Sequence, residues 1–183
     1  MKNLRLNYET LVKISRSLSK SKDPEEIIRM TVKSLKSALG IKGCALFMIN
    51  RQSKELEVAA STGLSTDYLS KGPVSTLHSI ADSLEDGPIA VYDVSDDPRI
   101  QYPEAAQKEG IASILSVPIM VGDEAIGAIR AYTAEKWEFT LDDVNLVQAL
   151  AQIAGILIEM TRLYQGQKEH IEVLATMCES PAL

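Results

Sequence analysis

Two apolar segments joined by a tight-turn pair restrict the fold of this chain more than any other feature of its sequence. Gly122-Asp123 joins ASILSVPIMV to EAIGAIRAYTA, and a Gly-Asp pair is typical of a two-residue β-hairpin turn. A second hairpin is predicted where CALFMIN (44–50) is followed by a polar turn and by ELEVAAS (55–61). Because hairpins join antiparallel strands, the chain is expected to build an antiparallel sheet.

Helical patterns flank these strands. Apolar residues at helical spacing predict a first helix over 3–20. Asp23-Pro24 predicts the start of a second, with Glu26 at capping-box spacing from Asp23, and Gly40 predicts its stop. A short strand at 89–94 lies in a loop-rich crossover, in which short helices are expected at 64–71, 74–84 and 103–110. The fold class is therefore α+β, a central antiparallel sheet with long N- and C-terminal helices on one face. Short helices and loops form a pocket on the other face.

Thr140 and Asp143 have capping-box spacing and predict the start of the last helix. This helix has two apolar stripes. The first stripe is rich in small residues and is suited to close packing on a sheet. The second has the alternating three–four spacing of a coiled-coil seam, which predicts a homodimer through the terminal helices. This predicted dimer seam, together with two positions of the first helix, comprises Leu146, Leu150, Ile153, Leu157, Met160, Tyr164, Leu11 and Leu18.

Length and charge limit the function classes. The 183 residues are 45% apolar and 24% charged, which is typical of one globular domain with helical extensions. The expected units are an N-terminal helix (1–22), a central domain (23–164) and a C-terminal extension (165–183). The net charge of −6 argues against binding to nucleic acid. Residues 1–36 are basic, yet a solvated helix face explains them better than a membrane or nucleic-acid contact. Without a signal peptide or a membrane span, a cytoplasmic protein is expected.

The second half of the chain resembles the GAF domain family. The resemblance rests on the order and spacing of short pieces: Asp93, Asp97-Pro98-Arg99, Tyr102-Pro103-Glu104, Glu109-Gly110-Ile111, Val117-Pro118-Ile119, Ile126-Gly127, Arg130-Ala131-Tyr132-Thr133, Phe139 and Ala151-Gln152. It implies a regulatory module that binds a small molecule between the sheet and the loop-rich face. It also implies a dimer through the first and last helices.

Strand alternation selects the candidate binding residues. If Gly127 allows close approach of the last helix, Arg130 and Tyr132 point into the pocket, as an anion donor and an aromatic wall. Ser116 and Met120 of the preceding strand are expected on the same face, and Tyr102 and Asp93 complete the candidate set. A structural pair between Arg130 and Asp93 is an equally good interpretation. The acidic run from Asp82 to Asp97 is more simply a solvated loop than a cation site.

The leading hypothesis is a non-catalytic, dimeric sensory module in signal transduction, whose ligand and cofactor the sequence does not name. It would regulate a signalling protein on another chain. One alternative is a pure interaction module with a closed pocket. A free methionine sulfoxide reductase, which some GAF proteins are, needs thiols in the pocket loops. The two cysteines here are Cys44, expected to be an apolar filler, and Cys178 in the tail. His78 and His170 lack further ligands at metal-binding spacing.

Overall fold

The computed structural model describes residues 8–50, 52–53, 55–72 and 87–179. Its centre is a five-stranded antiparallel sheet in the order β2-β1-β5-β4-β3. The strands are β1 (Gly43–Ile49), β2 (Leu56–Thr62), β3 (Ile89–Val91), β4 (Ser113–Val121) and β5 (Glu124–Thr133). The predicted fold class is confirmed, with each strand of the two hairpins within one residue of its expected bounds.

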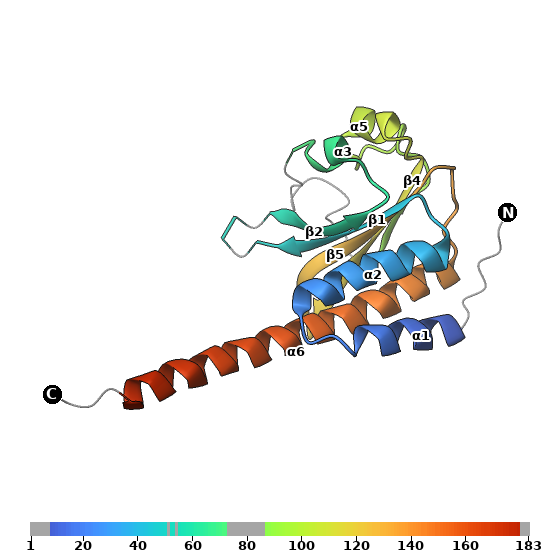
Figure 1. Cartoon of the computed structure of the whole chain (residues 1–183). Coiled ribbons are helices and arrows are strands. Elements are labelled where there is room, and N and C mark those ends of the chain that lie inside the picture. Colours follow the sequence, from blue (N-terminus) through green and yellow to red (C-terminus); the bar gives the residue numbers. More distant parts are fainter. Residues whose placement is uncertain (1–7, 51, 54, 73–86, 180–183) are drawn as a thin grey trace.

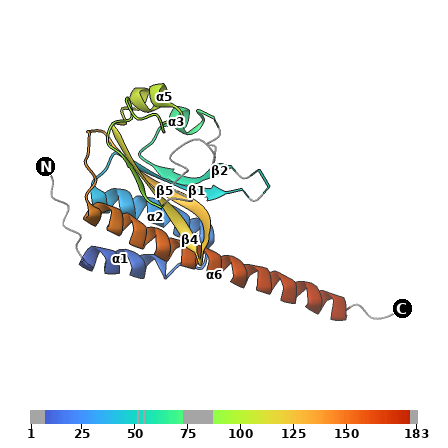
Figure 2. The ribbon, with the colours of Figure 1, turned by 180° about the vertical axis from the view of Figure 1, so that it is seen from behind.

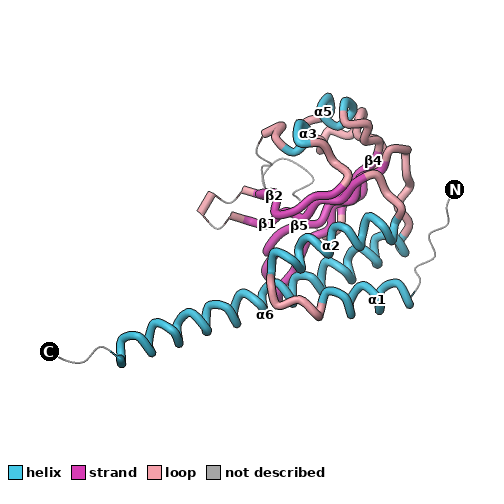
Figure 3. The backbone as a smooth tube through the Cα atoms, viewed as in Figure 1, coloured by secondary structure: helices cyan, strands magenta, loops and turns pink. Residues whose placement is uncertain are grey.

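The helices lie on opposite sides of this sheet (Figures 1 and 2). On one side are α1 (Tyr8–Leu18), α2 (Pro24–Leu39) and the long α6 (Leu141–Glu179). On the other are the short α3 (Thr66–Leu69) and α5 (Pro103–Lys108), with loops around them (Figure 3). We call these the helix side and the loop side of the sheet. The expected helix at 74–84 lies outside the described residues, as does His78.

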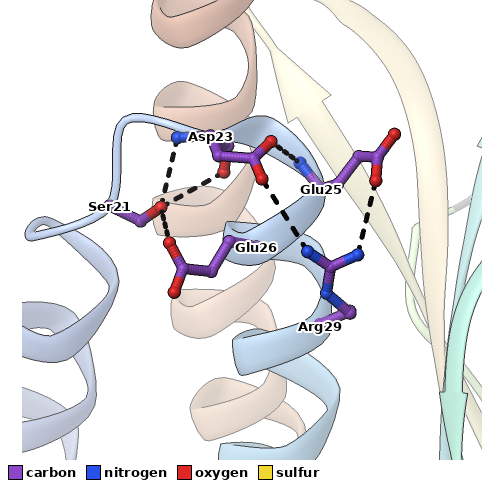
Figure 4. A network of polar contacts seen from close by, with 5 residues as sticks. All are labelled: Ser21, Asp23, Glu25, Glu26 and Arg29. Atoms are coloured by element: carbon purple, nitrogen blue, oxygen red, sulfur yellow. Dashed lines mark hydrogen bonds and ion pairs between the residues drawn. The ribbon is translucent and has the colours of Figure 1, made fainter.

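The start of α2 is fixed by side chains before and within its first turn (Figure 4). The Asp23 carboxylate accepts a hydrogen bond from the Glu25 backbone N–H at 3.0 Å, which satisfies one donor that the helix cannot pair internally. Glu26 accepts from the Ser21 hydroxyl, and that hydroxyl in turn accepts from the Asp23 N–H. In the predicted capping box Glu26 would bond the Asp23 N–H directly, whereas here the Ser21 hydroxyl bridges the two groups. Gly40 ends the helix at φ 62°.

The long hairpin contains an irregularity that the sequence does not predict. The pairing of β4 with β5 is regular from Ser113 to Ile119, and it shifts between Ile119 and Met120. Ile119 is in register with Gly127 and Met120 with Ala125, so the extra residue is Ile126 of β5, which packs against the helix-side residues. Pro118 lies beyond the part of β4 that pairs with β3, at a local edge where no ladder donor is needed.

Two hydrophobic clusters occupy the two sides of the sheet. The helix-side cluster joins α1, α2 and α6 to Cys44, Ile129 and Ala131, among others. The loop-side cluster joins Phe47 and Tyr132 to Tyr68 and to residues of the crossover. Residues of β5 therefore alternate between the clusters, which places Tyr132 on the loop side as predicted.

The reason proposed for this orientation has to be corrected. A Cβ on Gly127 would lie 2.1 Å from the Phe47 carbonyl oxygen, so this glycine is required by the close approach of β1. The close approach of α6 occurs at Gly155, where a Cβ would lie 2.8 Å from Ile119 Cγ2 and 3.1 Å from the Met120 oxygen. The glycine that lets the helix meet the sheet is thus on the helix itself.

The first half of α6 packs on the sheet and its second half extends beyond the domain (Figure 1). Thr140 and Asp143 form the predicted capping box, because the Asp143 N–H donates to Thr140 Oγ1 and the Thr140 N–H donates to Asp143 Oδ2. The segment Leu141–Lys168 is long and apolar enough to cross a membrane, by length and composition alone. However, the core residues Val147, Ala151 and Ile158 of this segment are fully buried on the helix side.

Candidate functional site

Arg130 lies on the loop side of β5, in the middle of the sheet. It is in register with Ala45 of β1 and Ser116 of β4, both of which are fully buried. Its own side chain is only 6% exposed, and its guanidinium carbon lies 5.0 Å from the centre of the Phe47 ring. Such stacking partly stabilises a cation. Nevertheless, Arg130 Nε and Nη2 are both buried without a hydrogen-bond partner in the part of the chain that the structure describes.

Two tyrosines lie beside this guanidinium. The rings of Tyr132 and Tyr68 meet edge to face, with centres 5.9 Å apart, and connect β5 to α3. Burial raises the pKa of Tyr68 to about 12, although the positive charge of Arg130 opposes the shift. Burial raises the pKa of Tyr132 still further, with Tyr68 adding to it and Arg130 opposing it. Both hydroxyls are therefore neutral at physiological pH and can donate or accept hydrogen bonds.

A second cation, Lys71, stands at the end of α3. Its ammonium donates to the Tyr68 carbonyl at 3.0 Å and lies 3.7 Å from the centre of the Tyr68 ring. Burial, with the nearby positive charge of Arg130, lowers the pKa of Lys71 to about 8. Lys71 thus remains mostly charged at neutral pH, and the two cations give this side of the sheet a positive potential.

Glu109 connects the two short helices of the loop side. Its carboxylate accepts hydrogen bonds from the Ser65 backbone N–H, at 2.9 Å, and from the Ser65 hydroxyl. Burial tends to raise the pKa of Glu109, but these hydrogen bonds, aided by Lys42 and Lys71, lower it overall. Because Ser65 is also the N-cap of α3, Glu109 holds the helix that carries Tyr68 against the end of α5.

The structure separates the residues that the sequence groups into one site. Ser116 and Tyr132 lie beside Arg130, as predicted. Tyr102 precedes α5, and its hydroxyl would lie 2.7 Å from a Cβ on Gly72, close in sequence to Lys71. Asp93 instead pairs with Lys136 and accepts from the Ser95 hydroxyl and N–H, so its described contacts belong to an exposed loop. Met120 belongs to the same alternation of β4 as Ser116, because Ile119 and Val121 on either side of it face Gly155 of α6.

Several residues of the site were not anticipated from the sequence. Phe47 could have been found by extending the alternation argument to β1, where it shares a side with Ala45. Tyr68 and Lys71 gave no usable signal, because α3 has four residues and no periodic pattern. Glu109 lies 44 residues from its partner Ser65, a separation that spacing rules do not reach.

The predicted dimer seam is divided between the core and the surface. Leu146, Leu150 and Leu18 are at most 4% exposed and already pack inside this chain. Ile153, Leu157 and Leu11 are half-buried against the same cluster. Met160 and Tyr164 are 62% and 60% exposed, and Leu163 between them and Ile171 further along the helix have similar exposure. The part of the predicted seam that this chain leaves uncovered therefore begins at about Ile153.

Among its described side chains, the protein offers neither a reactive thiol nor a cluster of metal-binding groups. Cys44 is fully buried on the helix side, and burial raises the pKa of its thiol far above the usual range. Among the described residues, no group of three or more His, Cys, Asp or Glu side chains could hold a metal ion.

Comparisons with known proteins identify the family. The GAF domain model matches residues 23–158, so the chain belongs to the GAF domain family. A similar solved structure is the GAF domain of a phosphoenolpyruvate-protein phosphotransferase from Coxiella burnetii. It is 20% identical, with a TM-score of 0.79 over 90% of this chain and 99% of that one.

Two further structures show how widely the fold is used. The domain of a putative two-component sensor histidine kinase protein from Sinorhizobium meliloti is 20% identical, with a TM-score of 0.68 over 79% of this chain and 96% of that one. The free methionine-R-sulfoxide reductase of Neisseria meningitidis, solved with its substrate, is 21% identical, with a TM-score of 0.73 over 85% and 90%. At these identities the likeness establishes the fold alone, and function has to be argued from this chain's own residues.

Proposed function

We propose that this chain is a regulatory module of signal transduction that binds a small molecule on the loop side of its sheet. The observation that carries the proposal is the burial of Arg130 with two donors that no described residue satisfies. A buried charge without a partner costs several kcal/mol, so a fold retains one chiefly where a ligand or a partner group supplies the missing interaction. Membership of a family with relatives in a sensor kinase supports the same interpretation.

The second part of the proposal is that the module is a homodimer through α6. Met160, Leu163, Tyr164 and Ile171 are each more than half exposed along one helix. Large apolar side chains rarely stand in such a row on a helix that is fully solvated. A second copy offers the same row, and a two-fold axis would bury both rows together.

Strand β5 connects the proposed ligand site around Arg130 with the core that contains α6. Arg130 and Tyr132 alternate along it with Ile129 and Ala131, which belong to the cluster that contains α6. A ligand that moves Arg130 therefore also moves the surface on which α6 packs, because close-packed interiors transmit small displacements. We propose that this coupling changes the dimer and reports to a signalling protein on another chain in the cytoplasm.

Catalysis is a less favoured alternative. A methionine sulfoxide reductase needs a nucleophilic thiolate and a resolving thiol, and this chain has two cysteines. Cys44 is on the helix side of the sheet, opposite Arg130, and its raised pKa keeps it protonated. Cys178 lies in the C-terminal part of α6, in sequence far from the loop-side residues. A module with a closed pocket, kept only for its dimer surface, is the other alternative.

Native mass spectrometry of the full chain, purified from its own host at increasing collision energy, tests the proposal. The expected result is a dimer that retains a small mass. A dimer without added mass at any energy would favour the closed interaction module. A monomer would contradict the dimer argument. Reduction of free methionine sulfoxide to methionine by the purified chain, with a dithiol supplied as the reductant that becomes a disulfide, would restore the enzyme alternative.

A further inference from the structure

The two unsatisfied nitrogens of Arg130 lie on the same edge of its guanidinium. Nε–H and the outward N–H of Nη2 are parallel and about 2.3 Å apart in any planar guanidinium, as part of its fixed fork of donors. Neither nitrogen has a described hydrogen-bond partner, and both are shielded from solvent. An acceptor that satisfies both must present two oxygen atoms side by side, as a carboxylate or a phosphate does.

The charges nearby fit such a group. Lys71 adds a second positive charge close enough to Arg130 for its pKa to be affected. Glu109 is the described carboxylate whose charge acts on Tyr68 and Lys71, and it accepts hydrogen bonds from Ser65. None of the described salt bridges includes Arg130 or Lys71. A ligand with a net negative charge is therefore favoured over a neutral or a cationic one.

The surfaces next to this edge are apolar and aromatic. Phe47 stacks under the guanidinium, and Tyr132 and Tyr68 stand beside it. Ala45, fully buried, is at the register position opposite Arg130 and adds an apolar surface. Tyrosine hydroxyls that stay neutral can also hydrogen-bond to an oxygen atom of the ligand.

We propose that the ligand of this site is an organic oxyanion with a planar apolar body, its two oxygens bound by the Nε–Nη2 edge of Arg130. The body lies against Phe47, Tyr132 and Tyr68, and Lys71 contributes long-range attraction. This inference rests on the proposed function, because it specifies the chemical class of the small molecule.

The test compares three probes of similar shape on the full chain, after any bound molecule has been removed by unfolding and refolding. Benzoate and phenyl phosphate carry the paired oxygens, whereas benzamide is a neutral isostere of benzoate. Thermal unfolding is measured with each probe for the wild type, Arg130→Met, Arg130→Lys and Arg16→Met. Arg16 is an exposed arginine of α1 and serves as the matched control.

In the wild type and in Arg16→Met, we expect at least one oxyanion to raise the Tm and benzamide to have no effect. A larger rise with benzoate indicates a carboxylate ligand, and a larger rise with phenyl phosphate indicates a phosphate ligand. Arg130→Lys keeps the charge but not the two-donor edge, so its affinity is expected to fall at least about tenfold. Without any probe, Arg130→Met is expected to raise the Tm by about 3 °C or more, because it removes a buried charged group two of whose donors have no described partner.

Two results would overturn the inference. If Arg130→Met lowers the Tm of the probe-free protein while Arg16→Met does not, the guanidinium is already paired within the fold. If benzoate and phenyl phosphate stabilise the wild type no more than benzamide does, the ligand is not an oxyanion of this kind. In either case, a small mass retained by the dimer in native mass spectrometry would leave the proposed function intact. If no mass is retained either, both this inference and the proposed function are contradicted.

Discussion

At the scale of single residues, the site depends on neighbours that lie far apart in sequence. Strand alternation is sufficient to place Arg130 and Tyr132 on one side of β5, because period two is a local property. It does not say which side faces the loops, and the role assigned to Gly127 for that choice is wrong. The aromatic and cationic groups beside Arg130 and Tyr132 come from α3, which is too short to have a pattern. Asp93 could not be assigned from the sequence for a similar reason, since its partner Lys136 lies in a different loop.

Lys71 offers a residue-scale prediction about pH. A lysine whose pKa is lower in the folded than in the unfolded chain lowers stability while it is charged. That cost is complete below a pH of about 8 and disappears as the pH approaches the unfolded value of about 10.4. The stability of the wild type relative to Lys71→Met should therefore rise between pH 7.5 and about 9.5, before the tyrosines titrate.

Urea unfolding of both proteins across this range measures the difference directly, and NMR titration of the Lys71 side chain gives the pKa itself. The comparison with Lys71→Met cancels groups that titrate in both proteins. A stability difference that stays constant from pH 7.5 to about 9.5 would show that Lys71 is not perturbed by burial and by Arg130.

At the scale of elements, the order and bounds of strands and long helices could be predicted, whereas the contacts between them could not. The Gly122 turn, the Thr140–Asp143 capping box and the Gly40 stop are local signals, and each appears where expected. The register shift at Met120 and the close approach at Gly127 arise from the pairing of strands. They depend on three-dimensional packing, which periodicity does not report.

The contact between α6 and the sheet leads to a prediction for two glycines of one helix. Gly155→Ala places a methyl group against Ile119 and the Met120 carbonyl, so we expect a loss of about 1–3 kcal/mol in the free energy of unfolding. Gly166→Ala is the matched control, because no atom lies within 4 Å of its added Cβ. It should gain about 0.5–1 kcal/mol from helix propensity alone.

Urea unfolding at equal protein concentration checks both variants. Equal stabilisation by the two substitutions would mean that α6 does not approach β4 as closely as described. Loss of stability in Gly166→Ala would mean that this part of α6 has a partner surface that excludes a methyl group.

At the scale of the whole molecule, the second half of α6 extends beyond the domain with an exposed apolar row (Figures 1 and 2). The sequence predicts a single seam from Leu146 onwards, and it cannot distinguish the part that the chain itself covers. Here α1 and α2 pack with the first half of α6, and this leaves the second half for a partner.

This division predicts which substitution separates the dimer. Tyr164→Glu introduces a charge in the exposed row and should raise the dimer dissociation constant at least about tenfold. Gln165→Glu adds the same charge to the neighbouring exposed position and should have little effect. Sedimentation equilibrium measures both, and far-UV circular dichroism shows that each variant remains folded. Equal weakening by the two substitutions would indicate a general charge effect rather than a seam.

The central claim is that binding on the loop side of the sheet is coupled to the dimer through β5. The most direct test measures the dimer dissociation constant of the gently purified chain and of the same chain after its bound molecule has been removed, with Arg130→Met alongside. Coupling predicts a difference of about fivefold or more between the two wild-type samples and none between the two Arg130→Met samples. A wild-type chain that retains a small molecule, yet dimerises equally well without it, would contradict the account.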